Sequence, residues 1–222
     1  MGTDTSIGCF RSSSLIATYP AMRFTAVTAQ GIQPGAFKKR VREFATLTAD
    51  SLHRQDPAGE TNLLEFEKFF RSHQRPFPLT KQISEAATRG FPPVPSPVLA
   101  LLALEAATGV LLGVQDLDAV EGHITLDALE VGESFTGMRG EEISCAPGEV
   151  VVRDAKAIIA SLFQGPDRRT AVKSDSRNIL FYVFDTGAGL GAGHDHAVEV
   201  IADLFPAQVA DATTVHSASR PG

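Results

Sequence analysis

Three cations and one hydroxyl lie close together in a short segment of the chain. Arg168, Arg169 and Lys173 surround Thr170, and apolar stretches of the strand type precede and follow them. A loop of this composition can hold a phosphate or a substrate carboxylate through charge-assisted hydrogen bonds. From spacing alone, an ordinary solvated hairpin loop is the more common origin of such a cluster. The segment is therefore a candidate anion site that needs support from other residues.

Carboxylates follow another apolar stretch. Asp116 and Asp118 come directly after the segment from Val110 to Gln115, and Glu121 follows them. Carboxylates at such a position can fix a substrate or a nearby backbone N–H, whereas aspartate is also common in turns that follow strands. Both interpretations are open at the level of the sequence.

Two patterns near the C-terminus lack the context that their chemistry needs. The glycine-rich segment 187–193 follows a strand, but too little chain comes after it to build the βαβ unit of a dinucleotide site, so we interpret it as a flexible turn. His194–His196 offers two imidazoles, yet no cysteine, further histidine or paired carboxylate stands nearby in sequence to complete a metal shell. We interpret Asp195 as a helix cap. We predict neither a metal nor another cofactor.

Covalent catalysis is not indicated either. Ser134 follows Gly132, but Thr136 stands where a nucleophile elbow needs its second glycine. Cys145 lies between Ser144 and Ala146, and neither neighbour supplies a cation that would favour the thiolate. We therefore expect Cys145 to be a buried structural cysteine.

Composition and charge narrow the class of protein. The chain has 222 residues, 43% of them hydrophobic, with 20 Lys and Arg against 26 Asp and Glu and a formal net charge of −6. This charge excludes a general electrostatic grip on DNA or an anionic membrane, so any RNA contact must be local. No apolar run approaches the length of a membrane span, and two cysteines cannot build a disulfide framework. We expect a cytoplasmic protein, and the sequence does not define an oligomeric state.

The elements that must position these residues fall into two halves. Apolar periodicity predicts helices over 35–55, 61–73, 80–89 and 98–108, with Thr80 as a cap and Gly90 as a stop. Two short strands, 15–19 and 24–27, come before the helices. The second half reads as strands over 110–114, 123–126, 150–153, 157–163 and 179–184, followed by a helix over 196–205. Helices first and strands later predict an α+β fold.

Domain organisation follows from the same pattern. Residues 15–206 are predicted to form one domain, because the apolar helix after the proline-rich segment 91–97 reads as a buried continuation rather than as a new unit. Residues 1–14 are polar and serine-rich, and we interpret them as a mobile arm. Residues 207–222 are small and polar, and we interpret them as a flexible tail.

A set of short motifs, in order and with consistent spacing, carries a resemblance to a known family. The motifs lie in the stretch from Pro95 to Phe135 and continue beyond it; they comprise Leu112–Asp118, Glu121, Gly122, Ile124, Leu126, Gly132, Glu133, Phe135, Gly148–Val151, Asp154, Arg169, Thr170, Lys173 and the strand Ile179–Val183, with Tyr19, Pro20 and Glu85 before them. With these motifs the chain resembles the B3/B4 domain family. That family includes the editing domain of the bacterial phenylalanyl-tRNA synthetase β subunit as well as free-standing proteins.

The resemblance implies a fold and an activity. It implies B3/B4-like layered sheets with packed helices, and a pocket that hydrolyses the ester of an amino acid wrongly attached to tRNA. The implied activity is trans-editing deacylation at a tRNA acceptor end, without metal or nucleotide cofactor. Such a reaction needs a pocket for the aminoacyl group, donors for the developing oxyanion and an oriented water. The alternative is a noncatalytic module that binds a tRNA end, an amino acid or a small carboxylate in the same pocket.

We expect the site at the end of the strand from Val110 to Gln115, closed by the loop that holds Arg169 and Thr170. Gln115 and Thr170 are the expected catalytic residues, which would orient the acyl group or the water. The expected substrate-binding residues are Asp116, Arg169, Glu105 and Gln164. Of these, Arg169 would hold a phosphate or carboxylate, and Asp116 would fix the neighbouring backbone.

Overall fold

The chain combines six α-helices with two main sheets in the part that the structure describes. The structure, a computed structural model, describes residues 7–33, 35–52, 57–187, 191–205, 207–211 and 214–215. The helices are α1 (Ser13–Thr18), α2 (Lys38–Ser51), α3 (Pro57–Ser72), α4 (Leu79–Arg89), α5 (Ser96–Thr108) and α6 (Gly191–Leu204), with a 3₁₀ turn at Leu117–Ala119. The strands are β1 (Cys9–Arg11), β2 (Arg23–Ala29), β3 (Leu112–Asp116), β4 (Ile124–Ala128), β5 (Glu133–Thr136), β6 (Glu142–Cys145), β7 (Val150–Arg153), β8 (Ile158–Ser161), β9 (Gly165–Pro166), β10 (Ile179–Asp185), β11 (Ala207–Asp211) and β12 (Thr214–Val215).

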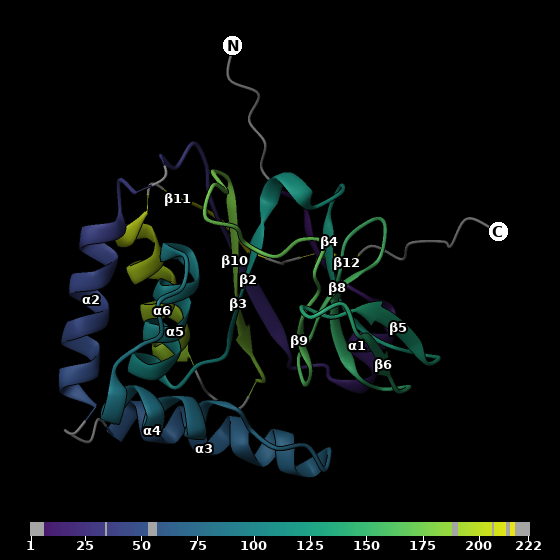
Figure 1. Cartoon of the computed structure of the whole chain (residues 1–222). Coiled ribbons are helices and arrows are strands. Elements are labelled where there is room, and N and C mark those ends of the chain that lie inside the picture. Colours follow the sequence, from purple (N-terminus) through teal and green to yellow (C-terminus); the bar gives the residue numbers. More distant parts are fainter. Residues whose placement is uncertain are drawn as a thin grey trace.

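The elements form three layers. A four-stranded sheet, in the order β11-β2-β10-β3, stands in the middle. Helices α5 and α6 cover one face of it, with α2 packed on the outer side of α5, and a six-stranded sheet, in the order β12-β1-β4-β7-β8-β9, lies on the other side (Figure 1). Helices α3 and α4 close one end of the helical and central layers (Figure 1). The α+β class predicted from the sequence is confirmed.

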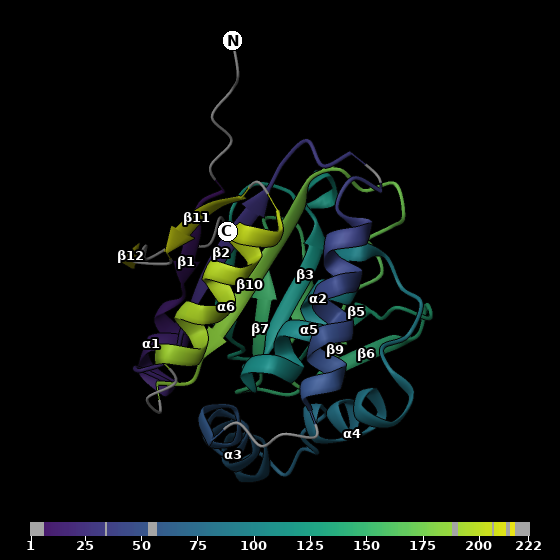
Figure 2. The ribbon, with the colours of Figure 1, turned by 90° about the vertical axis from the view of Figure 1, so that its left-hand side faces the viewer.

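The helices of the first half follow from their apolar positions. Helix α5 has buried residues on every side, and its last turn ends where Gly109 adopts the left-handed conformation at φ 66° and donates to the Glu105 carbonyl. Helix α4 ends at Gly90 as predicted, but Pro78 rather than Thr80 stands at its N-cap. Helix α2 packs against α5, which separates it from the central sheet (Figure 2). The predicted helices of this half are thus confirmed, with bounds shifted by a few residues.

The N-terminal segment is more ordered than expected. Residues 1–6 lie outside the described residues, but β1 within the predicted arm pairs in parallel with β4. The predicted strand 15–19 is wrong, because α1 forms there. The hydroxyl of Ser12 accepts the N–H of Leu15, and this N-cap bond favours a helix over the strand that the apolar run indicated.

The C-terminal segment also contributes to the sheets. Strand β11 pairs antiparallel with β2 and β12 pairs with β1, so the predicted flexible tail is wrong at 207–211 and 214–215, while the rest of that segment lies outside the described residues. The helix before it starts earlier than predicted. Asp195 lies inside α6 rather than at its cap, because the helix begins at Gly191 and Gly193 allows it to approach the Asn62 side chain closely.

Strand β3 is the open edge of the central sheet, and its register decides which groups that edge presents. In an antiparallel pair, alternate residues bond to the partner strand. The flanking bonds from Phe184 N–H to the Leu111 carbonyl and from Leu117 N–H to the Asn178 carbonyl show that odd-numbered residues bond toward β10. The backbone groups of Leu112, Val114 and Asp116 therefore point away from the sheet.

A glycine allows the next strand to press its largest side chain against β3. Gly113 is opposite Tyr182 in the register, and a Cβ built on Gly113 would lie 1.9 Å from the Tyr182 ring. The ring of Tyr182 is fully buried over this gap. The position therefore requires a residue without a side chain.

We expect Gly113→Ala to destabilise the protein by about 1–3 kcal/mol, because the new methyl group must displace a buried aromatic ring in a packed core. Chemical denaturation checks this, with Gly132→Ala as the control, since a Cβ at Gly132 meets its nearest atom only at 3.4 Å. Equal stability of the two variants would show that the Tyr182 ring does not need the gap.

Candidate functional site

A cavity of about 410 Å³ runs along the open edge of β3. Helices α4 and α5 form one wall, and the segment from Ala160 to Pro166 together with Tyr182 and Phe184 forms the other. The strand contributes Leu112–Val114, and Leu111 directly before it also lines the cavity. The lining is mainly apolar, with a few polar groups, which is the usual character of a small-molecule site. This cavity is the candidate functional site.

The backbone of Val114 lies in the middle of this cavity edge. The outward N–H of Leu112 is taken by the Glu105 carboxyl at 3.0 Å, and the outward N–H of Asp116 is taken by the Thr170 carbonyl at 2.7 Å. Among the hydrogen bonds of the described residues, none is made by the N–H or C=O of Val114 on this edge. Val114 thus offers one donor and one acceptor to whatever occupies the cavity.

Glu105 brings a carboxyl group to the same cavity from α5. The residue is buried, its Oε1 accepts the Leu112 N–H, and within the described part of the chain its Oε2 has no hydrogen-bond partner. Burial raises the pKa of Glu105 to about 8, against a smaller lowering by the Leu112 N–H. The unliganded carboxyl is therefore mainly protonated at neutral pH.

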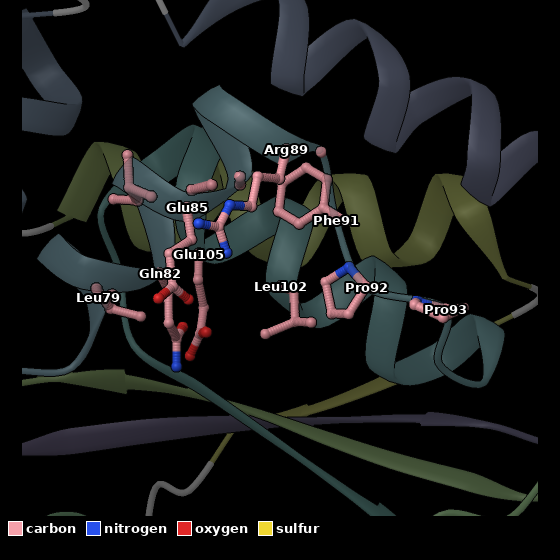
Figure 3. Close-up of a pocket in the computed structure, with 13 residues that line it drawn as sticks. Leu79, Gln82, Glu85, Arg89, Phe91, Pro92, Pro93, Leu102 and Glu105 are labelled. Atoms are coloured by element: carbon pink, nitrogen blue, oxygen red, sulfur yellow. The ribbon is translucent and has the colours of Figure 1, made fainter.

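Glu105 also lines a second cavity, of about 520 Å³, between α4 and the segment Gly90–Pro93. Gln82, Leu102 and Glu105 line both cavities. In Figure 3 the side chains of Gln82 and Glu105 extend in the same direction, while Phe91 and Pro92 lie on the opposite side of the cavity. The carboxyl of Glu105 therefore stands at the boundary between two concave spaces.

The two expected catalytic residues form a buried network behind the cavity wall. The Gln115 side-chain amide donates to the Ile159 carbonyl and to the Tyr182 hydroxyl, each at 3.0 Å. The Oε1 of Gln115 lies 3.0 Å from the Thr170 hydroxyl, which also contacts Asp167. Gln115 and Thr170 are completely buried and do not line the cavity. The hydrogen bond from Gln115 to Tyr182 connects this network to the cavity wall.

Tyr182 is the polar residue that the sequence analysis missed. Its ring lines the cavity, and its hydroxyl oxygen accepts a hydrogen bond from the Gln115 amide, so its own O–H is free to donate elsewhere. Burial raises the pKa of Tyr182, which keeps the hydroxyl protonated. The signal in the sequence is weak, because Tyr182 lies inside an otherwise apolar strand.

Asp116 and Arg169 do not line the cavity. The Asp116 carboxylate accepts the Ser176 hydroxyl at 2.6 Å and the Asp118 N–H at 3.2 Å. The Arg169 guanidinium donates to Asp154 and to the Ala119 carbonyl, both at 2.8 Å. The strand and the loop meet as expected, but these two side chains find their partners within the protein.

Gln164, which we predict to bind substrate, lines the cavity, but its amide nitrogen already makes hydrogen bonds within the protein. It donates to the Ser144 carbonyl at 2.9 Å and to the Glu149 carboxylate at 3.1 Å. Glu149 also pairs with Arg75. The nearby Cys145 is buried, and burial followed by the Glu149 carboxylate raises the pKa of its thiol to about 12. This thiol is structural rather than nucleophilic.

Two other features are absent from the described residues. No group of three or more His, Cys, Asp or Glu among them is arranged to hold a metal ion. No described helix has both the length and the apolar character that a membrane crossing demands.

The cavity thus assembles a small set of groups with complementary chemistry. Val114 N–H and the Tyr182 O–H are donors, Val114 C=O is an acceptor, and Glu105 offers a titratable oxygen. Two donors in an apolar space can stabilise a developing oxyanion, and a carboxylate with a raised pKa can accept a proton from water near neutral pH. The set contains no activated nucleophile among the described lining residues.

One similarity in sequence and one in fold connect this chain with phenylalanyl-tRNA synthetase β subunits. The chain is 35% identical over 68 residues to the phenylalanine–tRNA ligase β subunit of Mycoplasma genitalium, a match that covers 31% of this chain and 8% of that subunit. Its fold is similar to an N-terminal fragment of the phenylalanyl-tRNA synthetase β subunit from Pyrococcus horikoshii, with a TM-score of 0.50 at 10% identity.

That structural match covers 94% of this chain and 52% of the fragment, so the chain spans about half of the fragment it resembles. No family model matches the chain. The chain is therefore similar to a part of the phenylalanyl-tRNA synthetase β subunit, in sequence over 68 residues and in fold over 94% of its length.

The raised pKa of Glu105 makes stability depend on pH. In the unfolded chain the carboxyl loses its proton near its ordinary pKa of 4.5, whereas in the folded chain it holds the proton up to about 8. The folded state binds more protons between these values, so stability is complete below about 4.5 and falls as the pH rises toward 8.

We expect Glu105→Gln to remove this dependence, because the amide oxygen can still accept the Leu112 N–H without ionising. Thermal denaturation from pH 5 to pH 9 checks this. The variant should melt at least roughly 2–4 °C above the wild type at pH 9, the shift that 1 kcal/mol gives for a domain of this size. Parallel pH profiles for both proteins would contradict the burial of an ionisable Glu105.

Proposed function

We propose that this protein hydrolyses the ester bond of a misacylated aminoacyl-tRNA in trans, and that the aminoacyl group binds in the cavity beside β3. The similarity to the phenylalanyl-tRNA synthetase β subunit supports a tRNA-related ligand. We further propose that it does so in the cytoplasm, where it would meet the tRNA acceptor end. The observation that carries the proposal is the open Val114 backbone between a hydroxyl donor and a titratable carboxyl.

The proposed reaction uses these groups without covalent catalysis. Water attacks the ester carbonyl, and the Val114 N–H and Tyr182 O–H stabilise the oxyanion that forms. Glu105 Oε2 orients the water and takes its proton. When the tetrahedral intermediate collapses, the carbonyl re-forms, the bond to the ribose oxygen breaks, and Glu105 returns the proton to that oxygen, so that the free amino acid and the tRNA hydroxyl are released. Gln115 and Thr170 are positioning residues, because they hold Tyr182 rather than touch the substrate.

A noncatalytic binding module is the second candidate. The observation that favours it is the mainly protonated state of Glu105 at neutral pH, because a protonated carboxyl donates a hydrogen bond but does not accept a proton from water. In that case the cavity would retain an amino acid, a small carboxylate or a tRNA end without turnover.

A panel of purified aminoacyl-tRNAs, incubated with and without the protein, separates the two candidates. With Glu105 as the base, the rate above the uncatalysed background should rise with pH to a midpoint near 8 and then level off. Glu105→Gln should abolish this rise, and Tyr182→Phe should lower kcat about 10²-fold if the hydroxyl serves as an oxyanion donor.

Glu130→Gln is the matched control, since Glu130 is exposed and does not line the cavity. Its rate and pH profile should equal those of the wild type. Binding of an aminoacyl-tRNA without any hydrolysis above background would exclude the deacylase and leave the binding module.

A further inference from the structure

A second concave surface lies at the opposite end of α5 from Glu105. A groove of about 480 Å³ runs between the starts of α2 and α5 and the loop before β10. Lys38 and Arg42, one helical turn apart on α2, line it together with Lys173 of the loop. No aspartate or glutamate is among the described residues that line it. The groove therefore presents three cations and no carboxylate, in a chain whose net charge is −6.

These three cations form no ion pair with another described residue of the protein. Lys38, Arg42 and Lys173 are exposed, and none of them forms an ion pair in the described part of the chain. Some exposed cations elsewhere on the helices do pair, as Lys68 does with Glu65 and Arg71 with Glu67. Unpaired cations gathered in a concave surface give a local positive potential despite the overall negative charge.

The groove is held in shape by bonds that involve the expected site residues. The Lys173 N–H donates to the Ser176 hydroxyl at 2.9 Å, and that hydroxyl donates to Asp116 at 2.6 Å. The Ile32 N–H donates to the Arg177 carbonyl at 2.8 Å and ties the same loop to the segment before α2. The start of α5 has no side-chain cap, so its first backbone N–H groups add to the positive character of the groove.

The groove is continuous with the candidate site. It shares Arg42, Pro93 and Val94 with a neighbouring hollow, which shares Phe91 and the adjoining turn with the cavity in Figure 3. That cavity in turn meets the candidate site at Glu105. From Ser96 to Glu105 the path along α5 is roughly 14 Å at 1.5 Å per residue.

An aromatic side chain stands on this path. Phe91 is half-buried and lines both hollows between the cationic groove and the site. Cations that follow a backbone, together with an aromatic face on which a base can stack, are the features that proteins use to bind single-stranded nucleic acid. A lipid headgroup or a phosphopeptide would need the cations but not a path that leads into a second cavity.

We propose that this groove binds the sugar-phosphate backbone of a single-stranded RNA whose 3′ end enters the cavity beside β3. Lys38, Arg42 and Lys173 contact phosphates, and Phe91 stacks on a base between them and Glu105. The inference rests on the proposed function for the identity of the strand, since it makes the tRNA acceptor end the RNA that follows this path.

The test is fluorescence anisotropy with a labelled, uncharged single-stranded RNA that has the sequence of a tRNA acceptor 3′ end. The triple variant K38Q/R42Q/K173Q is compared with K68Q/R71Q/K81Q, which removes the same charge from cations that pair with glutamates on α3 and α4. The groove variant should bind at least tenfold more weakly. Its plot of log affinity against log salt should lose a slope of about 2, from about 0.7 for each phosphate contact.

The control variant should stay within twofold of the wild type, and Phe91→Leu should weaken binding at least fivefold with an unchanged salt slope. Circular dichroism establishes that each variant is folded. Equal losses in the groove and control variants, or no RNA binding by the wild type, would overturn the proposal. Groove-dependent binding to phosphatidylserine vesicles or a phosphopeptide without RNA binding would overturn it as well.

The proposal and the deacylase function fail separately. RNA binding that depends on the groove, with no ester hydrolysis for any aminoacyl-tRNA, would support the groove proposal and contradict the deacylase function. Hydrolysis with the same KM in the wild type and the groove variant would support the deacylase function and contradict the groove proposal.

Discussion

The bond between the Leu112 N–H and the buried carboxyl of Glu105 ties α5 to the open edge of the central sheet. An edge strand presents unpaired N–H and C=O groups that must be covered or used. Here a side chain covers the first outward position and the Thr170 carbonyl covers the third, so the backbone of Val114 between them stays open. The cavity exists because helix and loop meet the strand at its two ends and not at its centre.

The two expected catalytic residues lie behind the cavity wall and support it through buried hydrogen bonds. The Gln115 side-chain oxygen pairs with the Thr170 hydroxyl, and the Gln115 amide nitrogen donates to the Tyr182 hydroxyl. These bonds hold the Tyr182 hydroxyl at the cavity wall. Buried polar groups of this kind are costly unless they are satisfied, and a satisfied network holds its members in one geometry. Asp116 holds the loop that carries Lys173 through Ser176, so one set of polar residues supports both the cavity and the cationic groove.

The parts that sequence predicted well are those set by local periodicity. The helix at 98–108 and the strand at 150–153 were predictable because their apolar residues recur at a spacing that one element alone explains. The helix at the segment 15–19 was not predictable, because the apolar run favours a strand and the helix depends on one N-cap hydrogen bond to the Ser12 hydroxyl. Strands β1, β11 and β12 form in segments too polar and short to be recognised before their partners are in place.

Within the site, Glu105 and Gln164 line the cavity, and their role in substrate binding stays a prediction. Gln115 and Thr170 were expected to touch a ligand, but they are 55 positions apart in sequence and their mutual bond appears only when β3 meets the loop. Tyr182 was missed because its exposure to the cavity depends on Gly113, and that pairing follows from a strand register which sequence alone does not specify.

The position of the ligand on the edge of β3 can be measured directly by NMR. The isotope-labelled protein is titrated with an adenosine that carries its aminoacyl group through a 3′ amide, which the protein cannot hydrolyse as an ester. If the aminoacyl group binds along the open edge, the Val114 amide should shift and exchange its hydrogen more slowly, while the Leu112 amide keeps its bond to Glu105. Saturable binding that leaves the Val114 amide unchanged would contradict this assignment.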